Sequence, residues 1–256
     1  MKFAVVGDPV DHSRSPAIHN AAFASLGVDA HFDSWRVAPD SFDVVVEALR
    51  TGELQGVSVT MPHKHNAYAA ADELSLEASR TAAVNTLVMQ DGGLVGHNTD
   101  VAGVRHALAE VEQSDEAPIL LLGYGGAAAA ALLAVDGRDV FVSGREVPKA
   151  RALIDRVRVE AEVLPWGEPV QMATVINATP LGMSGEHLPD GVVERAGALV
   201  DMTYGPRRSP AVSDALAIGY PVVDGLAMLV GQAAEAFELF TGEHASIFVM
   251  DQAARS

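Results

Sequence analysis

A glycine-rich turn near the middle of the chain has the residue types that bind phosphate. It follows an apolar stretch at residues 119–122 and precedes an alanine-rich stretch. The turn fits the pattern Gly-x-Gly-x-x-Gly/Ala, in which the first glycine permits a tight turn and the second lets the backbone approach a pyrophosphate. Similar turns also occur without ligands. Because we expect a strand before it and a helix after it, we predict a dinucleotide site at Gly123, Gly125, Gly126 and Ala127.

The residues after the next expected strand indicate which dinucleotide binds. Strand 140–143 is followed by Gly144, Arg145 and Glu146. An acidic residue at the end of this strand usually accepts the 2′-hydroxyl of NAD, whereas a guanidinium suits the 2′-phosphate of NADP. Arg145 therefore favours NADP as the cofactor. Glu146 can pair with Arg145 or repel the phosphate, so NAD remains the alternative.

Hydroxyl groups and a lysine near the start of the chain suit a small polar acid. We expect Ser15 to be the N-cap of a helix with Pro16 at its first position, and Ser13 and Ser15 together make a favourable seat for a carboxylate. Thr60 and Lys64 flank Pro62 at the end of a short apolar strand, where α/β folds usually bind ligands. The alternatives are plain capping by Ser15 and a solvated lysine at the start of a helix.

The elements that must position these residues alternate between strands and helices. In the first part of the chain we expect strands at residues 3–6, 31–37, 56–60, 86–89 and 94–96, and helices at 15–26, 42–49, 64–71 and 100–111. Beyond it we expect strands at 119–122, 140–143, 174–177, 199–202 and 221–223, and a long last helix at 225–240. This alternation predicts an α/β chain. Asn85 and Asp100 lie in further loops, where ordinary turn chemistry would also explain them.

Composition excludes several classes of protein. The 256 residues include no cysteine, so disulfides, thiolate zinc sites and a cysteine nucleophile are excluded. The net charge of −17 argues against general binding of nucleic acid. No apolar run reaches the ~20 residues of a membrane helix, so we expect a cytoplasmic protein without membrane association. His63 and His65 lack the spacing of a helical metal site, and we predict no metal.

Seven separated motifs together resemble one family. They are Ser13-x-Ser15-Pro16, Val57-Ser58-Val59-Thr60-Met61-Pro62-His63-Lys64, Ala83-Val84-Asn85-Thr86, Gly96-His97-Asn98-Thr99-Asp100, Gly123-x-Gly125-Gly126-Ala127, Asn177-Ala178-Thr179-Pro180-Leu181-Gly182-Met183 and Asp224-Gly225-Leu226-x-Met228-Leu229-x-x-Gln232-Ala233. They are similar to the successive signatures of the shikimate dehydrogenases, in the family's order and over nearly the whole chain.

The resemblance implies a reaction and roles for these residues. The reaction is the reversible, NADPH-dependent reduction of 3-dehydroshikimate to shikimate, in aromatic amino-acid biosynthesis. The catalytic pair would be Lys64 and Asp100. The substrate would contact Ser13 and Ser15 through its carboxylate, Thr60, Asn85 and Gln232 through its ring hydroxyls, and Tyr204 near the carboxylate. Cofactor contacts would add Arg145, Thr179 and Met228 to the glycine turn.

The resemblance also implies a domain organisation. Residues 1–101 would form an N-terminal α/β substrate domain, and residues 102–223 a Rossmann-type, doubly wound NADP-binding domain. The C-terminal helices, within residues 224–256, would pack back on the N-terminal domain. The partner would be the small-molecule substrate, and the chain would be a monomer or a homodimer.

Three positions depart from the family's pattern. Ser58 stands where many members have asparagine. The usual Asn-Arg-Thr cofactor motif is Gly144-Arg145-Glu146 in this chain. Tyr124 replaces the usual alanine of the glycine turn, where we expect its side chain to point outward.

Reduction of a ketone requires a hydride on carbon and a proton on oxygen. A protonated Lys64 beside the carbonyl oxygen can polarise it and supply the proton, or it can stabilise charge while a water carries the proton. Two other functions are the alternatives: an NAD-dependent quinate/shikimate dehydrogenase, and a non-catalytic ligand-sensing homologue. A sensor would be expected to lack Lys64 or Asp100, and both are present.

Overall fold

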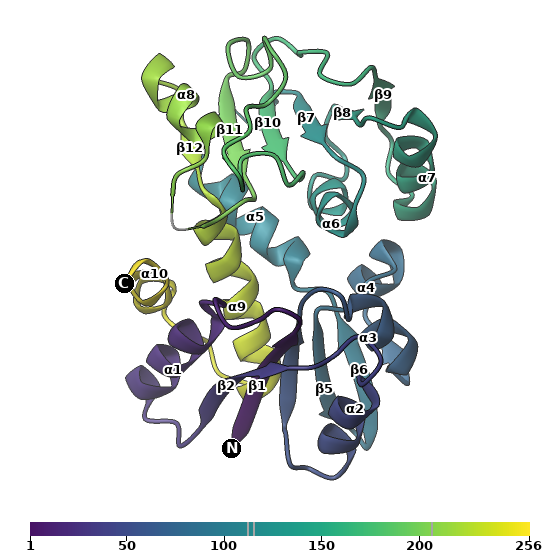
Figure 1. Cartoon of the computed structure of the whole chain (residues 1–256), viewed down its shortest axis with the longest axis vertical. Helices are drawn as coiled ribbons and strands as arrows, with labels where there is room; N and C mark the ends of the chain where they lie inside the picture. The colour runs from purple at the N-terminus through teal and green to yellow at the C-terminus, as the bar shows by residue number, and fades with distance from the viewer. Residues whose placement is uncertain (112, 115, 206) are drawn as a thin grey trace. The chain divides into compact units, whose positions relative to one another are not determined.

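The computed structural model describes residues 1–111, 113–114, 116–205 and 207–256. These residues form two compact units (Figure 1). The first unit consists of Met1–Thr99 together with Leu229–Ser256, and the second unit consists of Asp100–Met228.

The first unit is built around a mixed six-stranded sheet. Its strand order is β2 (His31–Arg36), β1 (Lys2–Gly7), β3 (Gly56–Val59), β5 (Thr86–Gln90), β6 (Gly93–His97) and β4 (Glu73–Leu74). Strand β1 is parallel to both β2 and β3, whereas β5 is antiparallel to β3 and β6. Strands β5 and β6 form a hairpin that turns through Asp91 and Gly92, which both have positive φ.

Helices cover both faces of this sheet. They are α1 (Ser15–Leu26), α2 (Asp43–Arg50), α3 (Lys64–Ala70), α4 (Leu76–Thr81), most of α9 (Gly225–Thr241) and α10 (Ile247–Arg255). Strand β1 shows why: Ala4 and Val6 belong to one buried cluster, and Phe3 and Val5 belong to another. A strand that is buried on both faces needs cover on both. Helix α10 packs against α1, so the return of the C-terminal helices to the N-terminal part is confirmed.

The second unit contains a parallel sheet with Rossmann topology. Its strand order is β12 (Val222–Val223), β11 (Ala198–Asp201), β10 (Thr174–Asn177), β7 (Ile119–Leu122), β8 (Val140–Ser143) and β9 (Glu162–Leu164). Counted from β9 within the unit this is the order 3-2-1-4-5-6 of a doubly wound fold, as predicted. The order reverses between β7 and β10, and such a switch point is where these folds bind ligands.

Helices complete the second unit. They are α5 (Asp100–Glu110), α6 (Gly126–Ala134), α7 (Val147–Val157) and α8 (Pro210–Ile218). Along β7, Ile119 and Leu121 join one buried cluster while Leu120 and Leu122 join the other. Continuous apolar residues are therefore required in this strand, in contrast to the alternation of a half-exposed strand.

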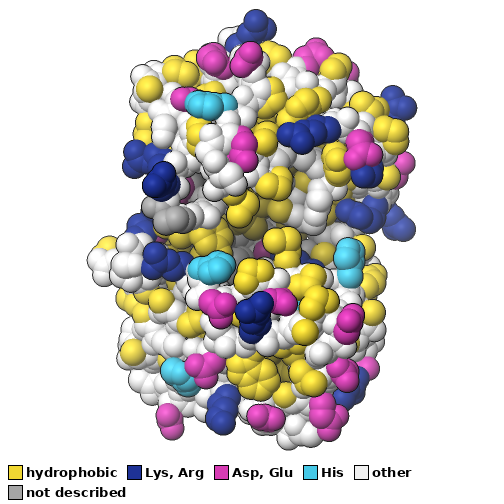
Figure 2. Space-filling model, in the orientation of Figure 1, with side chains coloured by type: hydrophobic (Ala, Val, Ile, Leu, Met, Phe, Trp, Pro, Cys, Tyr) yellow, Lys and Arg dark blue, Asp and Glu magenta, His cyan; other side chains and the backbone are white. Residues whose placement is uncertain are grey.

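Charged side chains of both signs are spread over the visible face of each unit (Figure 2). In the described part of the chain, no helix is long and apolar enough to cross a membrane. The same residues contain no group of three or more His, Asp or Glu side chains placed to hold a metal ion. His63 is buried, and its Nε2 lies 2.7 Å from the carbonyl oxygen of Val37, which gives this histidine a structural role.

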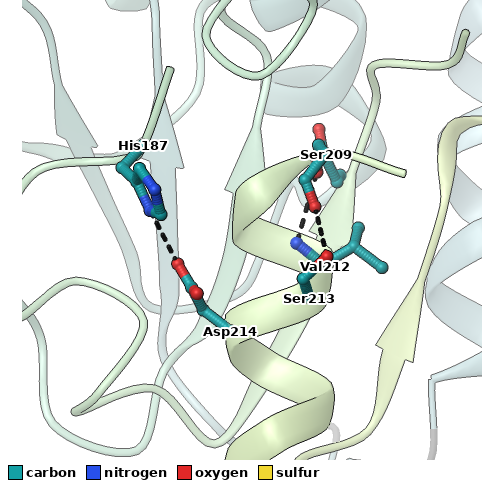
Figure 3. A network of polar contacts seen from close by, with 6 residues as sticks. His187, Ser209, Val212, Ser213 and Asp214 are labelled. Carbon is teal, nitrogen blue, oxygen red and sulfur yellow. Dashed lines mark hydrogen bonds and ion pairs between the residues drawn. The ribbon is translucent and has the colours of Figure 1, made fainter. Parts of the chain in front are cut away.

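A buried aspartate ties together the loops that follow β10 and β11. Asp201 is fully buried, and its Oδ1 accepts hydrogen bonds from Asn177 Nδ2 at 2.9 Å and from the N–H and hydroxyl of Thr203 at 3.0 and 2.9 Å. Its Oδ2 accepts from the hydroxyl of Ser209. That hydroxyl in turn accepts the N–H of Val212 at 3.2 Å and caps α8 (Figure 3). These hydrogen bonds stabilise a carboxylate that would otherwise be costly to bury.

A histidine is buried without hydrogen bonds in the first unit. His19 on α1 is fully buried, and its ring stacks on Phe32 with 4.2 Å between centroids and 3° between planes. Phe23, Phe237 and Phe240 also surround it. Among the described residues, neither ring nitrogen has a hydrogen-bond partner. Burial therefore lowers the pKa of His19 from 6.5 to about 3.

Removal of the Asp201 carboxylate should destabilise the second unit. Asp201→Ala leaves several buried donors without an acceptor, so we expect a loss of roughly 3 kcal/mol in the free energy of unfolding. Asp201→Asn keeps one acceptor oxygen and should lose about half as much. Urea unfolding of both variants measures the difference. Equal stability of Asp201→Ala and the native protein would contradict this role.

Acid should destabilise the first unit through His19. The folded state holds this histidine neutral, while the unfolded chain protonates it near pH 6.5. Its contribution to stability is therefore complete above pH 6.5 and decreases by about 1.4 kcal/mol per pH unit as the pH falls from there towards 3. His19→Leu should remove that part of the slope. Urea unfolding of both proteins between about pH 7.5 and 5 tests this, and identical slopes would disprove it.

Candidate active site

Two loops that carry predicted substrate residues of the first unit leave the same edge of its sheet. Strands β1 and β3 are parallel neighbours in which Val6 is paired with Val59, so their following loops start side by side. The N–H of Thr60 donates to the carbonyl oxygen of Val6 at 2.9 Å. A side chain on Gly7 would collide with the methyl group of Thr60. Glycine at position 7 is therefore what lets Thr60 approach β1.

The loop after β1 carries Ser13 and Ser15. The prediction that Ser15 caps α1 is wrong: the helix begins at Ser15, and Arg14 occupies the N-cap position without a side-chain cap. The hydroxyl of Ser13 accepts the N–H of Ser15 at 3.3 Å. Ser13 therefore accepts the hydrogen bond from the first amide of the helix, because its hydroxyl oxygen lies within reach of that N–H.

Asn85 is the centre of a buried polar network. Its Oδ1 accepts the N–H of Thr99 at 2.8 Å and the hydroxyl of Thr86 at 3.1 Å, while its Nδ2 donates to Thr99 Oγ1 at 3.0 Å. The same Thr99 oxygen lies 3.3 Å from Gln232 Oε1 on α9. Thr99 therefore links two predicted substrate residues from distant parts of the sequence. It belongs to the Asn98-Thr99-Asp100 motif, but its linking role was not predicted.

The predicted catalytic residues open two helices. Lys64 is the first residue of α3 and is half-buried, and its carbonyl oxygen accepts the N–H of Val84 at 3.3 Å. Asp100 is the first residue of α5 and is buried, with a relative exposure of 7%. A carboxylate in the first turn of a helix is stabilised by the helix dipole. Asp100 directly follows Thr99, so the Asn85 network fixes the backbone that leads into it.

Ser58, where the family usually has asparagine, lies on β3. Its side chain is buried, and its hydroxyl oxygen has no hydrogen-bond partner among the described residues. In register it faces Val5 on one side and Thr86 on the other.

The glycine turn of the second unit fits a dinucleotide. Gly123 has φ +116°, and a Cβ there would lie 2.9 Å from the carbonyl oxygen of Ala178, so only glycine is tolerated. A Cβ on Gly125 or Gly126 would instead project into open space. Helix α6 begins at Gly126. The turn therefore leaves backbone amides at a helix start open to a phosphate, and the residues present fit the cofactor.

Side chains gather where β8 ends, beside this turn. The guanidinium carbon of Arg145 lies 5.6 Å from the ring centroid of Trp166. Glu146 pairs with Lys149 at 2.6 Å and accepts the hydroxyl of Tyr124 at 3.0 Å. Of the two alternatives for Glu146, pairing with Arg145 is not seen among the described ion pairs. The hydrogen bonds from Lys149 and Tyr124 lower the pKa of Glu146, and Glu146 raises the pKa of Lys149.

The side chain of Tyr124 was expected only to point outward, but it also packs on a neighbouring loop. A Cβ on Gly144 would lie 2.6 Å from its ring, so Tyr124 packs over the residue that follows β8. The nitrogen of Lys149 lies 5.6 Å from the centroid of the same ring. The sequence alone does not predict this contact, because it depends on β7 and β8 being neighbours.

The other predicted residues of the second unit have varied surroundings. The hydroxyl of Thr179 donates to Asn177 Oδ1 at 2.7 Å and accepts the N–H of Leu181 at 3.1 Å, so this side chain stabilises its own turn. Tyr204 is exposed and lines a cavity of about 430 Å³ together with Thr203. Met228 is half-buried and packs against the core of the second unit.

The chain is similar to shikimate dehydrogenases over its whole length. Residues 5–87 match the shikimate dehydrogenase substrate binding domain family, and residues 225–255 match the shikimate 5′-dehydrogenase C-terminal domain family. The shikimate dehydrogenase (NADP(+)) of Desulforamulus reducens is 36% identical, over 95% of this chain and 91% of its own. That of Pyrococcus furiosus is also 36% identical, over 98% and 94%.

A solved structure has the same fold. The shikimate 5-dehydrogenase of Thermus thermophilus, in complex with NADP(H) and shikimate, is 36% identical and covers 100% of this chain and 98% of its own, with a TM-score of 0.88. Relatives of this identity and coverage, together with the motifs grouped at the two sheet edges, identify the family. The chain belongs to the shikimate dehydrogenase family.

Proposed function

We propose that this protein catalyses the reversible, NADPH-dependent reduction of 3-dehydroshikimate to shikimate. The observation that carries the proposal is full-length similarity to enzymes named for this activity, with the Thermus relative holding both NADP(H) and shikimate. The alternative of an NAD-dependent quinate/shikimate dehydrogenase is not favoured by these relatives.

The two parts of the chain divide the work of binding. Residues 1–101, joined by the helices of 224–256, bind the acid, and residues 102–223 bind the dinucleotide. Ser13 and Ser15 hold the carboxylate, assisted by Tyr204. This assignment is supported by the loop after β1, in which Ser15 is the first residue of α1 and Ser13, two residues before it, accepts its N–H.

The ring hydroxyls are bound by Thr60, Asn85 and Gln232. The network centred on Asn85 supports this role, because Thr99 holds Asn85 and Gln232 in fixed positions. Amide groups that are already oriented lose little conformational entropy when a ligand binds. The network therefore acts by positioning these side chains before the substrate arrives.

Lys64 and Asp100 act on the reacting carbonyl group. When bound, the reduced nicotinamide supplies the hydride to the carbonyl carbon. The ammonium group of Lys64 donates a hydrogen bond to the carbonyl oxygen and stabilises the negative charge that develops there. The oxygen takes its proton from Lys64 or from a water that Lys64 orients. The carboxylate of Asp100 balances the charge of the ammonium group.

The dinucleotide is held by the turn at Gly123, Gly125, Gly126 and Ala127. Arg145 binds the 2′-phosphate through its guanidinium, which Trp166 supports from one side. Thr179 contributes through the backbone of its turn, since its hydroxyl is already used. Met228 packs beside the nicotinamide.

Removal of either catalytic group should slow turnover strongly. We expect Lys64→Ala and Asp100→Asn to lower kcat by about 10²- to 10⁴-fold at saturating substrates, because each removes a group that acts in proton transfer or charge stabilisation. NADPH absorbance during dehydroshikimate reduction measures this. Lys2→Ala, a change at an exposed lysine of the same unit, should leave kcat unchanged. Near-native rates in both catalytic variants would exclude the pair.

A matrix of substrates and cofactors tests the activity itself. We expect the highest kcat/KM for shikimate with NADP, measured against quinate and against NAD. A higher value for quinate with NAD would replace the proposal by the catabolic alternative. No oxidation of NADPH by dehydroshikimate, even at high protein concentration over long times, would point to a ligand sensor.

A further inference from the structure

We propose that Glu146, held by Tyr124 and Lys149, is a specificity-determining residue that narrows the preference for NADP over NAD. The inference rests on the proposed function, since it concerns the dinucleotide of that reaction. It assigns a role to Tyr124 and Glu146, two of the three positions at which the cofactor site departs from the family's pattern; the third is Gly144.

Tyr124 and Glu146 are in direct contact. Tyr124 belongs to the turn after β7 and Glu146 follows β8, yet the tyrosine hydroxyl donates to Glu146 Oε1 at 3.0 Å. Lys149 Nζ lies 2.6 Å from the same carboxylate oxygen. Strands β7 and β8 are neighbours, with Leu122 paired to Ser143, so the two loops leave the same edge of the sheet. A residue of the glycine turn thus orients the carboxylate of Glu146.

The carboxylate of Glu146 does not cap the helix that follows it. Glu146 is the N-cap residue of α7, but it makes no side-chain cap hydrogen bond. An exposed pair of a glutamate and a lysine three residues later is common on helices and contributes little to stability. The bond from Tyr124 comes from a different loop, and it fixes the direction of the carboxylate in a way that such a pair alone does not.

The ring of Tyr124 fits tightly in this position. A Cβ on Gly144 would lie 2.6 Å from the ring, so glycine makes room for the tyrosine. Glycine here also replaces the asparagine of the usual motif. Tyr124, Gly144 and Glu146 are therefore compatible with one arrangement. In it the tyrosine ring covers the end of β8 and its hydroxyl holds the carboxylate.

The charges at the end of β8 decide between the two dinucleotides. Arg145 and Lys149 contribute two positive charges, and the carboxylate of Glu146 lowers the net charge of this group of side chains to +1. A 2′-phosphate carries close to two negative charges and gains from both cations, so the carboxylate repels it and competes for Lys149. A 2′-hydroxyl is a donor and can give its hydrogen to the same carboxylate. Glu146 thus weakens binding of NADP and strengthens binding of NAD.

Binding measurements on Glu146 variants test this proposal without relying on turnover. Glu146→Thr restores the family's residue, and Glu146→Gln removes the charge while keeping the shape. Because each variant loses one negative charge near the 2′ position, we expect both to bind NADP more tightly and NAD more weakly. The ratio of Kd for NAD to Kd for NADP should therefore rise about tenfold in each variant. Isothermal titration with NADP and NAD, and with 2′,5′-ADP against 5′-AMP, gives these values.

Tyr124→Phe isolates the contribution of the hydroxyl. It keeps the ring over Gly144 and removes only the bond to Glu146, so we expect the ratio to move in the same direction by a smaller factor. Glu194→Gln is the matched control, because it removes one exposed carboxylate near the start of β11, away from this cluster. The control should leave both dissociation constants unchanged.

The outcomes separate the two proposals. If the native protein binds NADP and the Glu146 variants keep its ratio of dissociation constants, the role of Glu146 is overturned while the proposed function stands. The role is also overturned if Glu194→Gln changes the ratio as much as Glu146→Gln, since the effect would then follow net charge alone. If the native protein binds neither dinucleotide, the proposed function fails first.

Discussion

Parallel pairing of neighbouring strands is the constraint on which both units depend. Parallel strands end at the same edge of a sheet, so loops that are far apart in the sequence begin side by side. In the first unit this joins the loops after β1 and β3. In the second it joins those after β7, β8, β10 and β11. This arrangement places the loop of Ser13 beside Thr60 in the first unit, and the glycine turn beside Arg145 in the second.

Buried polar networks then hold the loops in place. Asp201 is fully buried, and the hydrogen-bond donors described around it, from Asn177, Thr203 and Ser209, are all neutral. Asn85 has the same function in the first unit, where it binds Thr99. The Asp201 network joins the segments that follow β10 and β11, and the Asn85 network joins the residue before β5 to the segment after β6 and to α9. Stable loop positions therefore depend on satisfied donors and acceptors as well as on apolar packing.

Prediction from the sequence was most successful for elements with a long apolar pattern. Most strands of the two sheets and helices α1, α2, α3, α5 and α9 lie within a few residues of the predicted bounds. Helices α7, α8 and α10 were not assigned bounds from the sequence. Strands β4 and β9 and helix α4 were missed, because they are short and their residues are partly exposed, so periodicity carries little signal. For α4 a signal was available: Ser75 accepts the N–H of Ala78 at 3.1 Å as an N-cap.

The sequence by itself determined the α/β class, the strand, turn and helix around Gly123, and the resemblance to a family, because these depend on residue types at local spacings. Only the tertiary structure decided which partners the polar side chains take. Glu146 bonds Lys149 and Tyr124 instead of Arg145, and Thr99 joins Asn85 to Gln232. His19 is enclosed by aromatic rings, which leaves its nitrogens without partners among the described residues. Such contacts are made between residues on different elements, so their distances follow from how strands and helices pack.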